Sequence, residues 1–290
     1  MNESELAIVR RAYAMQILAA VNVSDARVEE AFAGVRREDF LGPGPWQIFR
    51  WGAMYRPTPS ADPIYLYTDD LVGIIPERRI NNGQPQLHAW LINQALPAPG
   101  EHVVHVGTGT GYYTAIMAHM VGASGRVTGI EYEPELAEQA RANFTAWPNV
   151  EIVEGDGALV YFDAADVIYV NAGTTGPAKP WLERLADKGR LILPLTTDKG
   201  FGDFGKTPNQ IVSQGAMFRI ARDGEEFHAK WISPVAIFPC AGNRDEASER
   251  ALAEALAKGR LTEITRLYRH TDVADEDCWL RGNGWCLTYR

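Results

Sequence analysis

The feature that most constrains the fold is an alternation of short apolar runs and helical runs that begins at residue 102. The apolar runs predict buried strands at HVVHV (102–106), RVTGIE (126–131), VEIVEG (150–155), ADVIYVN (165–171) and GRLILPL (189–195). The stretches between them predict helices at 114–121, 134–147 and 178–187. Strands that alternate with helices in this way form βαβ units, and such units build a parallel sheet. The sequence therefore predicts an α/β protein with a Rossmann-like, doubly wound and mostly parallel sheet.

The segments before this alternation predict helices and an irregular wrap. Residues 3–20 and 25–34 have helical periodicity, with Ser24 or Asp25 as a possible N-cap of the second helix. Residues 41–64 hold prolines among aromatic side chains, which indicates an ordered but irregular segment over a core. A further helix is expected to open at Pro85 and to end at Pro97 and Gly100.

The segments after the alternation predict an antiparallel ending. Two partly alternating stretches in residues 209–240 flank Arg222-Asp223-Gly224, which is a hairpin signal. Beyond residue 240, a solvated helix is expected to end at Gly259, followed by a tight hairpin over CWLRGNGWCL. We expect three parts: an N-terminal helical and irregular wrap (1–84), a core domain (85–240) and a C-terminal extension (241–290).

The cysteines exclude some classes of protein. Cys240, Cys278 and Cys286 are too few for a disulfide scaffold and contain no CxxC pair, so no metal site is expected. The predicted C-terminal hairpin places Cys278 near Cys286. We expect two packed thiols there rather than a disulfide, because the protein is expected in the cytoplasm.

Charge and hydropathy exclude two classes of binding partner from the expectation. The chain has 28 Lys and Arg against 37 Asp and Glu, a net charge of −9. A field of that sign repels phosphate backbones, so a nucleic-acid partner is not expected. No apolar run approaches the length of about 18–20 residues that spans a bilayer, so no membrane partner is expected. MNESELAIVRRAY has no apolar region of a signal peptide, which favours a cytoplasmic protein. The sequence leaves the oligomeric state open.

The strongest motif is a glycine turn, Gly107-Thr108-Gly109-Thr110-Gly111, between a predicted strand and a predicted helix. Glycines let the backbone pass close to a ligand, and the helix N-terminus offers unpaired N–H groups. Tyr112 occupies the place of the third glycine of a dinucleotide motif. This spacing favours the turn that binds S-adenosylmethionine. The alternative is a tight turn with no ligand.

Two acidic residues follow the next two predicted strands. Glu131 closes the second strand, where an acid can accept hydrogen bonds from both ribose hydroxyls. The alternative for Glu131 is an exposed carboxylate at a helix start. Asp156 lies between glycines after the third strand and can either reach the amino group of a base or make a turn.

The order of these motifs resembles the protein-L-isoaspartate O-methyltransferase family over roughly residues 10–240. The resemblance is carried by VGTGTGYYTA, GRVTGIEYEPELAEQAR, VEGDG, ADVIYVNAG and WLERLADKGRLILPL, and by the flanking VRREDFL, LYTDDLVGI and ISPVAIFPCAG. It implies a class I methyltransferase fold with S-adenosyl-L-methionine as cofactor. The expected cofactor-binding residues are Gly107, Thr108, Gly109, Thr110, Gly111, Tyr112, Glu131, Tyr132, Asp156, Gly157 and Asn171.

The chain departs from the family pattern at the loop before Pro85. Where the family has a hydroxyl residue, this chain has Gly83, and His105 occupies the position of an acid before the glycine turn. The departure at Gly83 predicts cofactor binding with poor isoaspartyl methylation, improved by Gly83→Ser if the backbone accepts a side chain. The departure at His105, a residue expected in the core, is expected to alter only the support of the glycine turn.

The expected catalytic residues are Asn81, Asn82, Gly83 and His88. An ionised carboxylate needs no general base, so the protein mainly holds nucleophile and methyl group in line. The amides of Asn81 and Asn82 could orient that carboxylate; alternatively they form a polar turn that caps the helix at Pro85. His88 is the best-placed base for a phenol, alcohol or amine nucleophile, or else a structural or cofactor contact.

Three functions remain after this reading of the sequence. The leading one is methyl transfer to a carboxylate oxygen of a protein or peptide. The others are an O- or N-methyltransferase of a small metabolite, and a non-catalytic module that binds S-adenosylmethionine. Nucleic-acid N-methylation is disfavoured because the fourth strand ends Val170-Asn171-Ala172-Gly173, which is not an Asn/Asp-Pro-Pro-aromatic motif.

Overall fold

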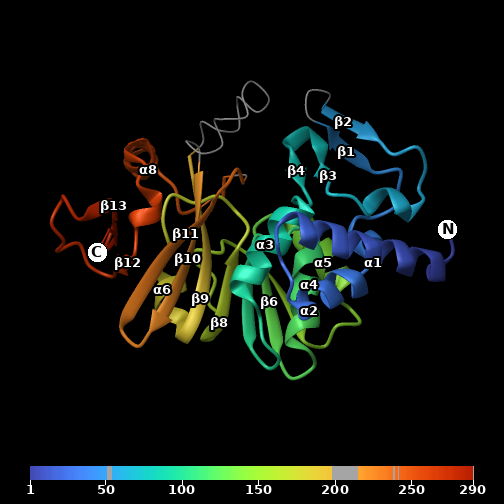
Figure 1. Cartoon of the computed structure of the whole chain (residues 1–290), viewed down its shortest axis with the longest axis horizontal. Coiled ribbons are helices and arrows are strands. Elements are labelled where there is room, and N and C mark those ends of the chain that lie inside the picture. The colour runs from blue at the N-terminus through green and yellow to red at the C-terminus, as the bar shows by residue number, and fades with distance from the viewer. Residues whose placement is uncertain (51–53, 198–214, 238, 241, 290) are drawn as a thin grey trace. The chain divides into compact units, whose positions relative to one another are not determined.

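The structure is a computed structural model that describes residues 1–50, 54–197, 215–237, 239–240 and 242–289 (Figure 1). It divides into two compact units. Unit 1 comprises Met1–Glu101 and Thr108–Glu154, and unit 2 comprises His102–Gly107 and Gly155–Arg290. Each unit is thus built from two separate stretches of chain. The three-part division expected from the sequence stays a prediction.

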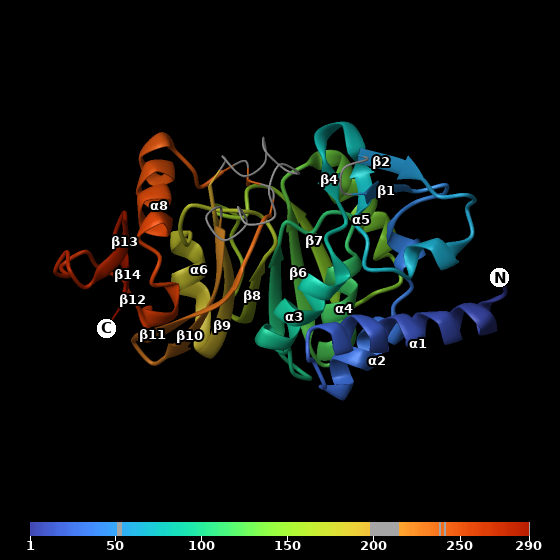
Figure 2. The same ribbon diagram turned by 45° about the horizontal axis from the view of Figure 1, so that its top comes forward.

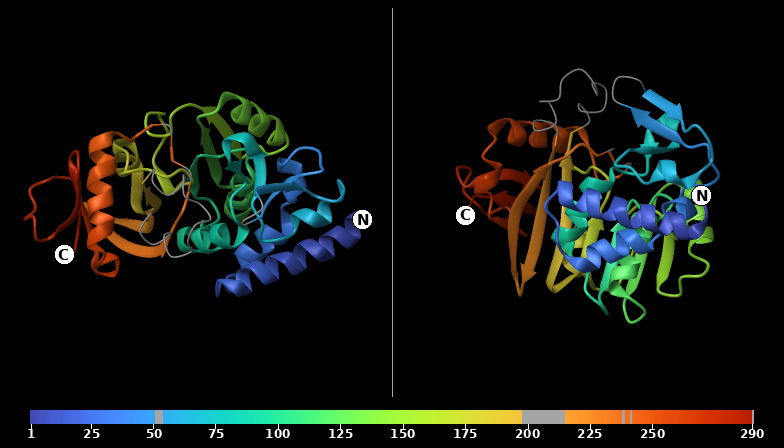
Figure 3. Two further views of the ribbon diagram at one scale, coloured as in Figure 1. Left: turned by 90° about the horizontal axis from the view of Figure 1, so that it is seen from above. Right: turned by 45° about the vertical axis from the view of Figure 1, so that its right-hand side comes forward.

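Unit 1 is mainly helical. Its helices are α1 (Glu3–Ala20), α2 (Ala26–Gly34), α3 (Pro85–Ala95), α4 (Tyr112–Val121) and α5 (Pro134–Asn143). The first two begin at side-chain caps, because Asn2 accepts from the Glu5 N–H and Asp25 accepts from the Arg27 N–H. The two N-terminal helices, deep blue in Figure 3, lie against each other. The expected helix starts at residues 3, Pro85 and Pro134 are confirmed, as is Asp25 as a cap.

Helix ends were predicted less well than helix starts. α3 ends at Leu96, whose left-handed backbone (φ 42°) donates its N–H to the Ile92 carbonyl. The expected end of this helix before Pro97 is therefore confirmed to within one residue. α5 ends at Asn143 rather than near Trp147, because Phe144 leaves the helical conformation and caps it.

The segment expected as an irregular wrap contains strands. Unit 1 holds a small antiparallel sheet in the order β2-β1-β3-β4, made of β1 (Gln47–Arg50), β2 (Met54–Pro57), β3 (Val72–Ile75) and β4 (Ile80–Asn81). Beneath it lies a separate small core of Trp46, Ile48, Leu66 and Val72. The expectation for residues 41–64 was wrong in this respect. Strands of two to four residues are too short to show a period in the sequence.

Unit 1 also carries one parallel strand pair. β6 (Arg126–Glu131) and β7 (Val150–Glu154) run side by side with Glu131 opposite Glu154. Both strands were predicted from their apolar runs. Their carboxyl ends therefore lie at the same edge, and Glu131 occupies that edge.

Unit 2 is a long mixed sheet. Its strands are β5 (His102–Val106), β8 (Ala165–Val170), β9 (Leu185–Thr196), β10 (Gly215–Asp223), β11 (Glu226–Pro234), β12 (Arg266–Tyr268), β13 (Cys278–Gly282) and β14 (Trp285–Thr288). They follow the order β13-β14-β12-β11-β10-β9-β8-β5. β5 and β9 flank β8 in parallel, and the strands from β9 onward pair antiparallel. The expected antiparallel hairpin is confirmed as β10 and β11; residues 209–214 lie outside the described residues.

Two helices accompany this sheet (Figure 2). α6 (Lys179–Arg184) packs on β9 and is shorter than the expected 178–187. α8 (Glu246–Lys258) packs on β13, begins at the Asp245 cap and ends at Gly259 as predicted. It buries Leu252, Ala255 and Leu256, so only part of this helix is solvated. The C-terminal strands continue the sheet, since β12 pairs with β11.

Cys278 and Cys286 form a disulfide between β13 and β14. The hairpin itself was predicted, but the expectation of two thiols was wrong. Their Cα atoms lie 6.4 Å apart, within the usual range for a disulfide. Thiols were expected because the protein was expected in a reducing compartment. The geometry of the hairpin itself allows a disulfide.

His105 in β5 is a core residue, as expected. It is fully buried, and its ring meets Tyr169 edge-on at a centroid distance of 5.3 Å. Burial lowers the pKa of His105 to about 3. The side chain is therefore neutral at physiological pH, unlike the acid that the resembling family has at this position.

Candidate functional site

The glycine turn opens α4, and two of its glycines have different tasks. A Cβ on Gly111, whose φ is +104°, would lie 2.4 Å from the Phe144 ring, so packing requires glycine there. A Cβ on Gly109, with φ +58°, would approach only Ile74, at 3.8 Å. Gly111 therefore holds the turn against the core, whereas Gly109 leaves room for another molecule beside the N-terminus of α4.

Glu131 is tied to this turn. Its side chain accepts a hydrogen bond from the Gly109 N–H at 2.6 Å and one from the Glu133 N–H at 3.0 Å. Only 6% of Glu131 is exposed, and burial raises the pKa of its carboxyl group. Glu131 is therefore not an exposed carboxylate at a helix start. The structure brings Gly109 and Glu131, predicted from separate motifs, into direct contact.

The amides of the loop before α3 are used within the loop. Asn81 accepts from the Tyr55 hydroxyl at 2.6 Å and donates to the Arg79 carbonyl at 2.7 Å. Asn82 accepts from Arg37 Nε at 3.1 Å. The alternative that these residues cap α3 was wrong, because its N-cap is Gln84 and the Gln86 N–H of its first turn donates to Asp69 Oδ1 at 2.7 Å. Their amides hold the backbone of the loop in place.

Arg37 was missed in the sequence. It is fully buried in a 3-10 turn (Arg37–Phe40). Its guanidinium donates to the carbonyls of Leu66 at 2.8 Å, Thr68 at 3.2 Å and Asp70 at 3.0 Å, besides Asn82. Arg37 thus joins the segment LYTDD to the Asn81–Gly83 loop. Both segments carried the family resemblance, but no pattern in them indicated the contact.

His88 lies beneath the same loop. It is 1% exposed, and its ring stacks on Tyr113 at 3.6 Å with an angle of 13° between the planes. The Tyr113 hydroxyl donates to the Gly83 carbonyl at 3.2 Å. This packing favours the structural alternative for His88 over a general base.

Gly83 is a position that a side chain cannot occupy without movement. Its φ is +48°, and a Cβ there would lie 2.2 Å from His88 Nε2. We therefore expect Gly83→Ser to lower the free energy of unfolding by about 2–3 kcal/mol and not to improve turnover. Urea unfolding of the variant measures this.

A suitable control for Gly83 is Gly42→Ser. Gly42 has a similar φ of +65°, but no atom lies within 4 Å of its added Cβ. Gly42→Ser should lose only the backbone contribution, about 1 kcal/mol. Equal losses in the two variants, or a stable and more active Gly83→Ser protein, would contradict the steric explanation.

Unit 2 contains four of the predicted cofactor residues, which are Gly107, Asp156, Gly157 and Asn171. Asp156 follows β7 in the chain, is half-buried and accepts from the Ala158 N–H at 2.9 Å, so it makes the expected turn. Gly157 accepts from Trp181 Nε1 at 2.7 Å. A Cβ on Gly157 would lie 2.3 Å from Val106 Cγ1, so only glycine fits beside β5.

Asn171 and Gly107 are neighbours at the ends of β8 and β5. Asn171 donates from its backbone N–H to Val106 at 2.8 Å and from Nδ2 to the Gly107 carbonyl at 3.4 Å. Gly107 has φ +79°, and a Cβ would lie 3.0 Å from the Asn171 carbonyl oxygen. The first glycine of the turn is therefore held by the end of β8.

Two negative findings concern the described residues alone. In that part of the chain, no group of three or more His, Cys, Asp or Glu side chains could hold a metal ion. Among its helices, none is long and apolar enough to cross a membrane.

Comparison with known proteins identifies the family. The model of the family Protein-L-isoaspartate(D-aspartate) O-methyltransferase (PCMT) matches residues 12–215. This chain belongs to that family. A protein-L-isoaspartate O-methyltransferase of Methanoregula boonei is 31% identical over 237 residues, which cover 80% of this chain and 92% of the relative. The family assignment made from the sequence is confirmed.

Other relatives match over a shorter length. Protein-L-isoaspartate O-methyltransferase 2 of Archaeoglobus fulgidus is 47% identical over 100 residues, 33% of this chain. The match spans about half of that relative, 46% of its length. Sequence identity is therefore concentrated in one part of the chain.

Solved structures support the same fold. A protein-L-isoaspartate O-methyltransferase superposes with a TM-score of 0.64 at 26% identity, over 83% of this chain and 69% of that one. A Plasmodium falciparum protein solved with S-adenosyl-L-homocysteine gives 0.60 at 17% identity, over 81% and 99%. The expected α/β class I methyltransferase fold, with a parallel core and an antiparallel extension, is confirmed. S-adenosyl-L-methionine is the cofactor of this family of methyltransferases.

Proposed function

We propose that this protein transfers a methyl group from S-adenosyl-L-methionine to the free α-carboxylate of an isoaspartyl residue in a protein or peptide. Membership of the family supports the reaction. One observation supports the cofactor assignment most directly. The Gly109 N–H donates a hydrogen bond to Glu131, so a buried acid lies beside a glycine turn that has room for a ligand.

We propose the cofactor contacts as follows. The N-terminus of α4 and Gly109 would take the amino-acid end of the cofactor, and Glu131 would accept from the ribose hydroxyls. Asp156 would accept from the adenine amino group. The complete proposed set is Gly107, Thr108, Gly109, Thr110, Gly111, Tyr112, Glu131, Tyr132, Asp156, Gly157 and Asn171.

The reaction needs no general base from the protein. A sulfonium methyl is already activated, and an ionised carboxylate attacks it without losing a proton. A structural role for the buried His88 is compatible with this mechanism. Orientation of the acceptor would fall to the backbone of the Asn81–Gly83 loop, whose amide side chains are engaged elsewhere.

The test is methylation of an isoaspartyl peptide. The release of S-adenosylhomocysteine measures the turnover. We expect turnover with that peptide and none with the same peptide carrying aspartate. The rate should be low, because Gly83 stands where the family has a hydroxyl residue. Loss of one positioning hydrogen bond lowers a rate on the order of 10²-fold. Methylation of a small carboxylate or phenol instead would favour the metabolite enzyme. Binding without turnover of any acceptor would favour a binding module.

A further inference from the structure

The chain beyond the family match returns to the carboxyl end of β8. Pro239 forms a parallel bridge with Gly173, and the Cys240 N–H donates to the Gly173 carbonyl at 2.7 Å. Arg244 Nη1 donates to the same carbonyl at 2.8 Å. Residues 239–240 and 242–249 are called the return segment below. They lie outside the matched residues 12–215.

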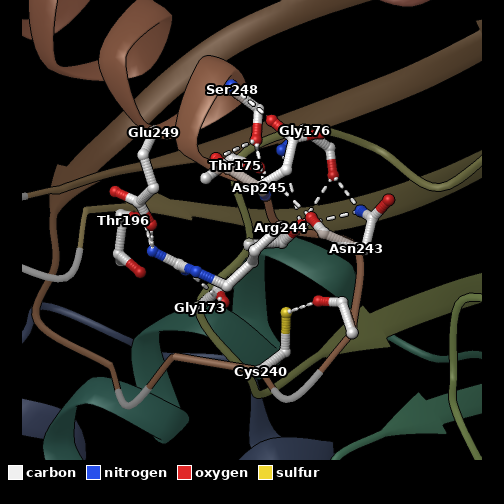
Figure 4. A network of polar contacts seen from close by, with 12 residues as sticks. Gly173, Thr175, Gly176, Thr196, Cys240, Asn243, Arg244, Asp245, Ser248 and Glu249 are labelled. Atoms are coloured by element: carbon white, nitrogen blue, oxygen red, sulfur yellow. Dashed lines mark hydrogen bonds and ion pairs between the residues drawn. The ribbon is translucent and has the colours of Figure 1, made fainter.

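Polar contacts fasten the return segment to the loop after β8 (Figure 4). Asn243 Nδ2 donates to Thr174 Oγ1 and to the Gly176 carbonyl, both at 2.8 Å. The Thr175 hydroxyl bonds the Asn243 carbonyl at 3.1 Å and Ser248 Oγ at 2.9 Å. The side chain of Asn243 thus bonds the Thr174–Gly176 loop, and the side chain of Thr175 in that loop bonds the return segment.

Arg244 adds a buried charge to this network. Its side chain is 9% exposed, donates to the Thr196 carbonyl at 3.0 Å and forms an ion pair with Glu249 (Figure 4). Removing one partner of a buried ion pair is costly, because the other charge is left uncompensated. The return segment is therefore a fixed part of unit 2 at this point.

The return segment also touches Asp156. A Cβ on Gly242 would lie 2.1 Å from Asp156 Oδ2 and 2.8 Å from its Cγ. The Asp156 carboxylate thus lies directly against the Gly242 backbone. Asp156 Oδ1 accepts from the Ala158 N–H, so the carboxylate is held by its own turn on one side and by Gly242 on the other.

We propose that the return segment is a positioning element for adenine recognition, with Gly242 seating the Asp156 carboxylate. This inference rests on the proposed cofactor role of Asp156. Gly242 acts through Asp156 and touches no cofactor atom in this proposal. The position of this one acid would then depend on residues outside the match to the family model, which covers residues 12–215.

The direct test is Gly242→Ala, because φ at Gly242 is outside the left-handed region and the three atoms nearest to an added Cβ all belong to the Asp156 carboxylate. Calorimetric titration with S-adenosylhomocysteine should show binding about tenfold weaker, the size of a disturbed hydrogen bond to a charged group. Titration with S-inosylhomocysteine, which lacks the adenine amino group, should change little. The preference for the adenine compound should therefore shrink in the variant.

A double-mutant cycle separates this effect from a general loss of structure. In an Asp156→Ala background, Gly242→Ala should cause no further loss of affinity, because the side chain it displaces is gone. Arg250→Ala is a control, since Arg250 is an exposed residue of α8. Its affinities should equal those of the wild type.

The outcomes are distinguishable. Full affinity in a folded Gly242→Ala protein, equal losses for both ligands, or a further loss beyond Asp156→Ala would overturn the inference. Wild-type protein that binds no S-adenosylhomocysteine would overturn the proposed function as well.

If Gly242→Ala does not fold, the variant Asn243→Gly tests the inference in its place. It suits φ +55° and removes the bonds to Thr174 and Gly176. It should weaken only the adenine compound, and unchanged binding would refute the proposal.

Discussion

Replacing Arg37 with methionine should lower the free energy of unfolding by about 3–5 kcal/mol, a large part of the stability of an ordinary domain. The change removes the donors to the Leu66, Thr68 and Asp70 carbonyls and to Asn82. Acceptors left buried without a donor lose their full solvation. Equilibrium unfolding in urea measures the difference.

Two further variants sharpen this prediction. Arg37→Lys keeps the charge but not the planar fork, so it should recover less than half of the lost stability. Arg36→Ala is the matched control, because the Arg36 side chain is 45% exposed and forms ion pairs with Glu3, Glu38 and Asp39 at 3.4–3.6 Å. Its loss should stay below about 1 kcal/mol. Similar losses at the two neighbouring arginines would show that Arg37 does not fasten the two segments.

Replacing Glu131 with alanine should weaken binding of S-adenosylhomocysteine by about 1–3 kcal/mol, or roughly 10- to 100-fold. The variant removes the acceptor proposed for the ribose hydroxyls and frees the Gly109 N–H. Calorimetric titration measures the affinity. Glu133→Ala is the control two residues away, since Glu133 pairs with Arg78 at the surface. Equal affinities of Glu131→Ala and wild type would refute the site.

The same residue should make cofactor binding depend on pH. Burial raises the pKa of Glu131 above the ordinary value of 4.5. Because ribose hydroxyls bond the ionised form best, affinity should be full at neutral pH and fall as the pH drops through that raised pKa. Glu131→Gln should remove the dependence. A raised carboxyl pKa favours proton binding by the folded state, so this group does not drive acid unfolding.

The strands β5, β6 and β8 were predictable because most of their residues are buried. Every residue of β5 is buried, and such runs between helical segments have one common explanation. The glycine turn and Glu131 were predictable because a fold of this kind needs glycine and acid at fixed strand ends. These signals are local in the sequence, and each element carries its own.

The contacts around the Asn81–Gly83 loop were not predictable. Arg37 bonds residues about 30 to 45 positions away, and nothing in VRREDFL distinguishes a buried arginine from an exposed one. Asn81 and Asn82 were expected to face an acceptor or a helix end. Their partners Tyr55 and Arg37 belong to a small sheet and a short turn that have no visible period.

The family match ends at residue 215, where β10 begins. A chain shortened there would keep β9 but lose its antiparallel partner, which pairs along Arg190–Thr196. The backbone N–H and C=O groups of an apolar strand would then lie open, and such an edge recruits strands from other chains. Here the sheet ends instead on β13, a strand of five residues that carries Arg281. The C-terminal strands thereby leave β9 no open edge on the side of β10.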